Sequence, residues 1–179
     1  MPERIARRGA SGARWPAGTA ALLMLMSLLA ACGFGAASDA ERLALDPLTL
    51  ERTGWPNDYL VCPAERCTAP ADRTAPVLDL PALDQLRLWE EMAAMSERTR
   101  ILGMDETALT LHVEQRSRIF GFIDTIVVHV LPFDDGLPTA ERSTFAAYSR
   151  SELGFGDMGV NQARLESWIA QVEAVAGTR

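Results

Sequence analysis

The sequence predicts an α+β domain in which a small antiparallel sheet of three or more strands packs against one helix that precedes it and one that follows it. Apolar residues recur at helical spacing over residues 80–98 and again over residues 160–175. Between these helices, three segments have the side-chain pattern of strands, and the connections between successive strands are short. We therefore expect an antiparallel meander with both helices on one of its faces.

Each predicted helix has an identifiable start and one apolar face. Asp79 is the expected N-cap of the first helix, and Asn161 is that of the last. The apolar faces consist of residues at helical spacing: Leu83, Leu86, Ala93 and Ala94 in the first helix, and Leu165, Trp168, Ile169 and Val172 in the last.

The three predicted strands differ in how buried they should be. Residues 109–114 alternate between apolar and polar side chains, which indicates a half-buried strand. Residues 126–131 are denser in β-branched residues and suit a central strand. Residues 132–138 have the composition of a loop, and residues 143–150 form the third strand. The core domain should thus span residues 82–176.

Two segments with little regular structure are expected before the core. Residues 32–45 begin with small residues that have little to bury, which is typical of a flexible tether. Residues 46–81 contain six of the ten prolines, so we expect an extended, irregular segment. Trp55 and Tyr59 indicate that part of this segment packs on the domain.

Residues 1–31 have the pattern of an export signal. Four arginines come first, and an uncharged stretch of residues 17–31 follows, which is shorter than the roughly 20 apolar residues of a membrane-spanning helix. This order predicts a secretory signal peptide. The pair Arg7-Arg8 would suit twin-arginine export, but the residues that should follow such a pair are missing.

The end of this signal is more specific. Leu29-Ala30-Ala31-Cys32 resembles the bacterial lipobox, which implies cleavage before Cys32 and acyl chains, such as palmitate, on the mature protein. Two or more chains hold a protein stably on a membrane. The alternative is an ordinary cleaved signal followed by a chance cysteine. Gly33 is not acidic, which in such lipoproteins favours the periplasmic face of the outer membrane over the inner membrane.

The charge of the mature chain disfavours nucleic acid as a partner. Residues 1–31 hold four of the 17 basic residues and one of the 24 acidic residues, so the remainder has a net charge of −10. Phosphate contacts dominate the affinity of nucleic-acid binders, and an acidic surface opposes them. A membrane, reached through lipid on Cys32, and an envelope protein or small anionic ligand are the partners that we expect.

Cys62 and Cys67 remain once Cys32 is assigned to lipid. In an oxidising compartment a disulfide is the default for such a pair, with free thiols as one alternative. A metal site is the other alternative, but zinc needs four ligands. Only His112 and His129 could add imidazole nitrogens, and both fall in predicted strands remote from the cysteines. We predict no metal and no cofactor.

Polar residues of two distant segments form a candidate cluster where the third strand turns into the last helix. The cluster comprises Arg116, Arg118, Asp124, Ser149, Arg150, Ser151, Asp157, Asn161 and Arg164. One interpretation is an ion-pair network that fixes the last helix on the sheet, because arginine suits bidentate pairing with carboxylates. The other is an anion-binding pocket at the N-terminus of that helix. Asp157 counts against the pocket, since its carboxylate would already occupy the helix end.

Two catalytic interpretations find little support. Residues 154–159 match G-x-G-x-x-G, but a dinucleotide site needs a parallel βαβ unit and an acidic residue about 20 positions further on. The glycines are better explained by a tight corner. A hydrolytic triad needs a histidine base, and His112 and His129 each alternate within an apolar strand. We predict no catalytic residue.

The two polar segments resemble the domain of unknown function 1499 family, over about residues 83–172. The resemblance is carried by Arg116 through Asp124, then by Tyr148 through Ser151, Gly154, Asp157, Gly159, Val160, Asn161 and Arg164. The chain departs from the family at Glu152, where many members have arginine, and at Thr125, where a second acid is frequent. Glu152 therefore weakens the anion-site interpretation. The resemblance implies an exported or membrane-associated protein and no established activity.

Together these observations predict a lipid-anchored periplasmic envelope protein whose domain is a non-catalytic binding or structural module. The alternative is an uncharacterised envelope hydrolase.

Overall fold

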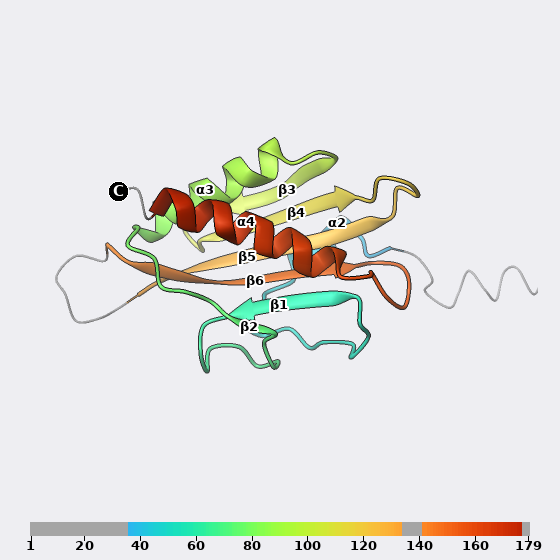
Figure 1. The fold of residues 1–179 in the computed structure, drawn as a ribbon, viewed down its shortest axis with the longest axis horizontal. Coiled ribbons are helices and arrows are strands. Elements are labelled where there is room, and N and C mark those ends of the chain that lie inside the picture. Colours follow the sequence, from blue (N-terminus) through green and yellow to red (C-terminus); the bar gives the residue numbers. More distant parts are fainter. Residues whose placement is uncertain (1–35, 134–140, 177–179) are drawn as a thin grey trace, which may run out of the picture. The chain divides into compact units, whose positions relative to one another are not determined.

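One mixed sheet of six strands organises the described part of the chain. The computed structural model describes residues 36–133 and 141–176 (Figure 1). The strands are β1 (Asp58–Cys62), β2 (Arg73–Thr74), β3 (Thr99–Asp105), β4 (Thr110–Arg116), β5 (Ile123–Pro132) and β6 (Ser143–Ser151); the helices are α2 (Asp39–Leu43), α3 (Ala82–Met95) and α4 (Val160–Ala176). The strand order is β2-β1-β6-β5-β4-β3. The predicted α+β fold, with a helix before and after the predicted strands, is confirmed.

The meander from β3 to β6 is antiparallel throughout, and β1 joins it antiparallel to β6. Two details correct the sequence prediction. β1 and its parallel neighbour β2 lie inside residues 46–81, which we expected to be irregular. The prolines flank β1 and do not interrupt it, so the ladder is intact. β3 was not predicted, because a register shift between Ile101 and Gly103 breaks its alternation.

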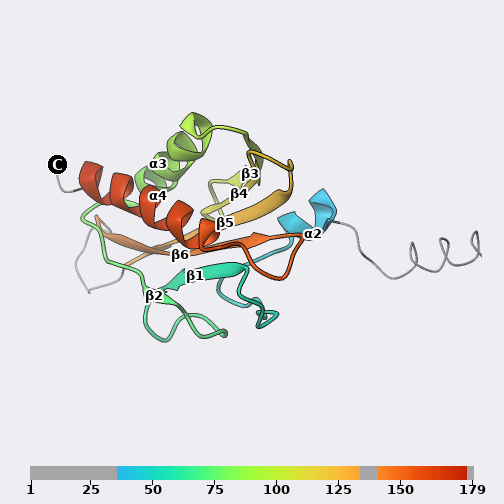
Figure 2. The ribbon, with the colours of Figure 1, turned by 45° about the vertical axis from the view of Figure 1, so that its right-hand side comes forward.

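Both long helices cover the same face of the sheet, as expected (Figures 1 and 2). Trp89 of α3 is fully buried at the centre of this layer. Its ring meets Phe145 of β6 edge-on, with 5.0 Å between centroids, and lies 6.5 Å from Trp168 of α4. Aromatic pairs of this geometry add to the hydrophobic stabilisation from burial. This core fixes α4 along β6 and so places the residues at the start of α4.

The opposite face of the sheet is covered by the chain that precedes α3. A second, smaller apolar cluster forms there from Leu50, Leu60, Cys62, Ala146 and Tyr148. The Cys62–Cys67 disulfide borders this cluster, with 6.2 Å between the Cα atoms, which confirms the predicted pairing.

Residues 36–45 correct the predicted tether. They include α2, which begins at a capping box in which Ser38 accepts from the Glu41 amide and the Glu41 carboxylate accepts from the Ser38 amide. Arg42 of this helix is only 4% exposed. α2 is therefore part of the folded domain and packs against the sheet.

The expected N-caps also need correction. α3 begins after Pro81, which makes no side-chain capping bond. Asn161 lies inside α4 and not before it, because Val160 is the first residue of that helix.

Some predictions lie outside the described residues. These are the signal peptide, Cys32 and the start of the tether, together with most of the predicted loop at 132–138. Within the described ranges, none of the helices has the length and apolar composition needed to span a bilayer.

Replacing both Cys62 and Cys67 with alanine should lower the free energy of unfolding by about 2 kcal/mol or less, because the disulfide closes a short loop. Denaturant unfolding of the native chain and the variant measures this difference. A reductant should destabilise the native chain by a similar amount and leave the variant unchanged. A native chain that is insensitive to reductant would argue against the bond.

Candidate functional site

The nine residues of the predicted polar cluster do not form one cluster. Neighbouring residues of a strand point to opposite faces of a sheet. Ser149 of β6 bonds to α4, whereas the next residue, Arg150, bonds to Glu152 on the face away from α4. Two separate groups result. The helix-side network lies around Arg164, Asp124, Ser149 and Asn161, and the outer-face network lies around Glu114, Arg150 and Glu152.

Arg164 of α4 is the centre of the helix-side network. Its guanidinium donates to Asp124 Oδ2 and Gln115 Oε1, both at 2.5 Å. One terminal nitrogen also donates to Ser149 Oγ at 2.7 Å and to Asn161 Oδ1 at 2.6 Å. The side chains of Arg164 and Asp124 are 7% and 5% exposed. This buried pair therefore joins α4 to β4, β5 and β6 at one point.

Asn161 extends the helix-side network into the loops. Its side-chain amide donates to the backbone carbonyl of Asn57 at 2.9 Å, to Ser151 Oγ at 3.2 Å and to Asp157 Oδ2 at 2.7 Å. Asn57 in turn donates to the Ser151 and Gly154 carbonyls. The loop before β1 and the β6–α4 loop are thus held together by two buried asparagines.

Asp157 occupies the N-terminus of α4, as its sequence position suggested. Its two carboxylate oxygens accept from the backbone amides of Gly159 at 2.9 Å and Asn161 at 2.7 Å. Gly154 and Gly159 have φ values of 97° and 80°, so the loop uses two glycines for the left-handed backbone that the corner needs. Because the carboxylate fills the helix end, this arrangement favours the ion-pair interpretation over the anion pocket.

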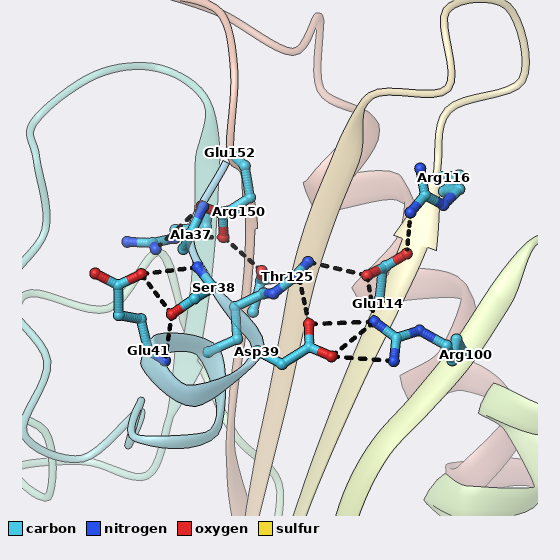
Figure 3. A network of polar contacts seen from close by, with 11 residues as sticks. Ala37, Ser38, Asp39, Glu41, Arg100, Glu114, Arg116, Thr125, Arg150 and Glu152 are labelled. Carbon is cyan, nitrogen blue, oxygen red and sulfur yellow. Dashed lines mark hydrogen bonds and ion pairs between the residues drawn. The ribbon is translucent and has the colours of Figure 1, made fainter. Parts of the chain in front are cut away.

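The outer-face network is centred on Glu114 of β4, whose side chain is 3% exposed (Figure 3). Three arginines converge on its carboxylate. Arg42 Nη1 and Arg100 Nη2 lie 3.0 and 2.9 Å from Oε2, and Arg116 Nη2 lies 3.0 Å from Oε1. Asp39 of α2 also accepts from Arg42 and Arg100. The network therefore fixes α2 on the sheet.

The sheet register explains why these charges meet. Arg100 pairs with Glu114, Glu114 with Thr125, and Thr125 with Arg150 across four adjacent strands. Residues in register on one face are neighbours, so a polar row crosses the sheet. Asp58 of β1 continues it opposite Arg150.

Glu152 ends the outer-face network next to the start of the described chain. It accepts from Thr125 Oγ1 at 2.5 Å, from Arg150 Nε at 3.2 Å and from the backbone amide of Ala37 at 3.2 Å (Figure 3). Thr125 and Glu152 are the two positions at which the sequence departs from the family resemblance. Since they touch, the departures belong to one local arrangement.

The pKa values reflect this pairing. Burial would raise the pKa of Glu114, but the hydrogen bond from Arg100 and the charges of Arg100, Arg116 and Arg42 outweigh it, so the pKa lies below the ordinary value. The hydrogen bond from Arg100 is the main cause of the lowered pKa of Asp39.

Arg118 differs from the other predicted residues, because it has no hydrogen bond or ion pair within the described ranges. It is exposed and borders a groove of about 360 Å³ between the β4–β5 turn and the β6–α4 loop. The remaining lining is largely apolar and includes Phe120, Phe122, Leu153 and Met158. Asp124, Ser151 and Asp157 reach this groove from the helix-side network.

Both histidines contact the segment between α2 and β1. The His112 Nε2 atom lies 3.0 Å from the Leu45 carbonyl oxygen, and the His129 Nδ1 atom lies 3.1 Å from Asp46 Oδ1. No serine, threonine or cysteine of the described residues is hydrogen-bonded to either ring. In the same ranges, no group of three or more His, Cys, Asp and Glu side chains is arranged to hold a metal ion.

Several members of both networks were missed from the sequence. Glu114 and Arg100 are alternating strand residues with no distinctive pattern, and only the register brings them together. Gln115 and Asn57 carry no charge and gave no signal. Arg42 could have been found, because Ser38-Asp39-Ala40-Glu41 is a capping-box sequence and predicts a helix around it.

Replacing Arg164 with leucine should lower the free energy of unfolding by about 3–5 kcal/mol, because Asp124 is left buried without a partner. Arg116→Leu is the matched control, since the Arg116 side chain is 54% exposed and its pair should contribute about 1 kcal/mol or less. Denaturant unfolding of both variants measures the difference. Equal decreases in the free energy of unfolding would show that the buried Arg164 contributes no more to stability than the exposed Arg116.

Acid should release α2 from the sheet. The lowered pKa values of Glu114 and Asp39 mean that their contribution to stability is complete above the ordinary values of 4.5 and 3.8. It is lost as the pH falls through the lower values of the folded state. The protection factors of the α2 amides, which compare the measured exchange rate with the intrinsic rate at the same pH, should therefore fall at acid pH, and fall less in Glu114→Gln. Protection that is independent of pH would contradict this account.

Comparison with known proteins identifies the family of this chain. A family model described as "Protein of unknown function (DUF1499)" matches residues 59–172, which is more than half of the sequence. The match contains Glu114, Asp124, Arg150 and Arg164, the central residues of both networks, whereas α2 precedes it. Searches of curated proteins and of solved structures found no match. The chain therefore belongs to the DUF1499 family of proteins of unknown function.

Proposed function

We propose that this protein is a lipid-anchored protein of the cell envelope, held on the periplasmic side through acyl chains on Cys32. The observation that carries the proposal is the lipobox-like Leu29-Ala30-Ala31-Cys32 at the end of an uncharged stretch that follows four arginines. Gly33 favours the outer membrane over the inner membrane.

The domain serves as a binding or structural module and not as a catalyst. Its buried charged side chains support this assignment, because they form ion pairs with one another. Asp124 is paired with Arg164, and Glu114 with three arginines. A general acid or base must exchange protons with a substrate within hydrogen-bond reach. Carboxylates that are held in buried ion pairs are better suited to fixing a structure.

A hydrolase is the alternative activity, and the histidine contacts weigh against it. A triad needs a histidine bonded to a nucleophile on one side and to an orienting group on the other. His129 has an orienting group in Asp46, but its other expected partner, a hydroxyl or thiol, is missing within the described residues. The proposal is therefore a module that binds or organises other envelope components.

The binding part of this proposal rests on Arg118 and the groove that it borders. Arg118 is an exposed guanidinium without a partner in the described ranges, next to an apolar lining. Such an arrangement suits a partner that presents both negative charge and apolar surface.

Replacing Cys32 with serine should abolish fatty-acid labelling of the protein and leave an uncleaved precursor, because the thiol that receives the lipid is lost. Radiolabelled palmitate incorporation and electrophoretic mobility measure both effects. The control is Cys62→Ser with Cys67→Ser, which retains Cys32 and should label normally. Labelling that persists in Cys32→Ser would refute the anchor.

A further inference from the structure

Exposed apolar side chains gather at one end of the sheet. Of the ten large apolar residues that are exposed in the described ranges, seven lie in three segments, which are the loop before β1, the β4–β5 turn and the β6–α4 loop, and an eighth, Val160, begins α4. Ile119 is 81% exposed, Phe120 74% and Phe155 68%, and Met158 is fully exposed. We call these three segments the apolar end. Contiguous apolar surface of this kind marks an interaction site.

The sheet register places the three segments together. β5 starts where β6 ends, since Asp124 pairs with Ser151, so the β4–β5 turn and the β6–α4 loop lie at the same end of the sheet (Figure 1). The loop before β1 joins them, because the rings of Trp55 and Phe155 lie 5.5 Å apart. The groove beside Arg118 lies within this end.

The loops are built to present these side chains outward. Phe120 and Phe122 stack on each other, with 5.3 Å between their ring centroids. Met158 has a φ of 54°, an unfavourable backbone for a residue with a side chain, yet the residue is fully exposed. The buried asparagines Asn57 and Asn161 hold the loops beneath in place.

The start of the described chain lies at this same end. The Ala37 amide bonds to Glu152, the residue that precedes Leu153 of the apolar end. Five residue steps separate Cys32 from Ala37, and a fully extended chain covers at most about 3.6 Å per step, or about 18 Å in total. Lipid on Cys32 would therefore hold the apolar end, and not the opposite end, close to the bilayer.

The charges at this end suit a membrane surface. Arg118 is exposed and unpaired in the described ranges, and the Arg116 side chain beside the turn is 54% exposed. Glu97 in the nearby α3–β3 turn is exposed but paired with Arg98. The carboxylates nearest the groove, Asp124 and Asp157, are engaged within the domain. Arginines around aromatic residues are typical of interfacial binding to anionic lipids.

From these observations we infer that the apolar end docks into the headgroup region of the bilayer that holds the anchor. Phe120, Met158 and Trp55 enter the boundary between headgroups and acyl chains, and Arg118 meets lipid phosphate. This inference rests on the proposed lipid anchor, and it adds a second contact that fixes the orientation of the domain. In this orientation the apolar end contacts the membrane, and the opposite end of the sheet, with the β3–β4 turn, points away from it.

The test uses the chain from Cys32 to Arg179, which contains both apolar clusters and all described helices and strands. With Cys62 and Cys67 paired, Cys32 is the free thiol, and it is coupled to a maleimide lipid in phosphatidylethanolamine–phosphatidylglycerol vesicles with brominated acyl chains. Bromine should quench Trp55, while Trp89 and Trp168 are buried and keep their fluorescence. The Trp55→Phe variant gives the fluorescence of Trp89 and Trp168 alone.

Phe120→Glu combined with Met158→Glu should abolish the quenching of Trp55. Both side chains are exposed, so the variant should melt at the same temperature as the native chain. The control combines Ala108→Glu in the β3–β4 turn with Ala174→Glu near the end of α4, which adds the same charge at the opposite end and should leave quenching intact. Absence of quenching in the native chain, or equal quenching in both variants, would overturn the inference.

Because the lipid is coupled to Cys32 chemically, the vesicle experiment tests membrane docking independently of whether cells attach lipid to Cys32. If fatty-acid labelling in cells fails but Trp55 is quenched on coupled vesicles, the anchor is wrong and the docking surface stands. If labelling succeeds and quenching is absent, the anchor stands and the apolar end does not dock on lipid.

Discussion

The alternation of side chains along β5 and β6 is the constraint on which the arrangement of charge depends. Asp124 and Ser149 point to the helices, and Thr125 and Arg150, their immediate neighbours in sequence, point away. Each strand thus supplies both networks at once. A one-residue slip of β6 would turn Arg150 toward α4, and a one-residue slip of β5 would turn Asp124 away from Arg164, so both networks help to specify the register.

The two networks have different tasks in the fold. The helix-side network joins the start of α4 to three strands and two loops, and its ion pair, Arg164–Asp124, is almost fully buried. The outer-face network joins α2 to the sheet, and its arginines are partly exposed. Buried ion pairs add less to stability than their number suggests, but they penalise misplacement of either partner. The helix-side network therefore holds the loops of the apolar end in one conformation, which is what a surface that presents aromatic residues requires.

Sequence reasoning predicted the elements better than the contacts. Helical apolar spacing identified α3 and α4, and the alternation or density of apolar residues identified β4, β5 and β6, which are buried over most of their length. β1 and β3 were missed, since prolines flank the first and a bulge interrupts the second. The polar cluster was misjudged because Ser149 and Arg150 were assigned to one site although they are adjacent strand residues. Alternation alone would have separated them. The convergence of three arginines on Glu114 could not be predicted, because Arg100 and Arg42 reach it only through the sheet register and the path of α2.

The central claim is that Asp124 is coupled to Arg164 through the helix side of the sheet and is independent of Arg150 on the other side. Double-mutant cycles of unfolding free energy with alanine at these three positions test this directly. The account predicts a coupling energy above about 1 kcal/mol between Asp124 and Arg164, and additivity within about 0.5 kcal/mol between Asp124 and Arg150. A coupling to Arg150 as large as that to Arg164 would contradict the division of the charges between two faces.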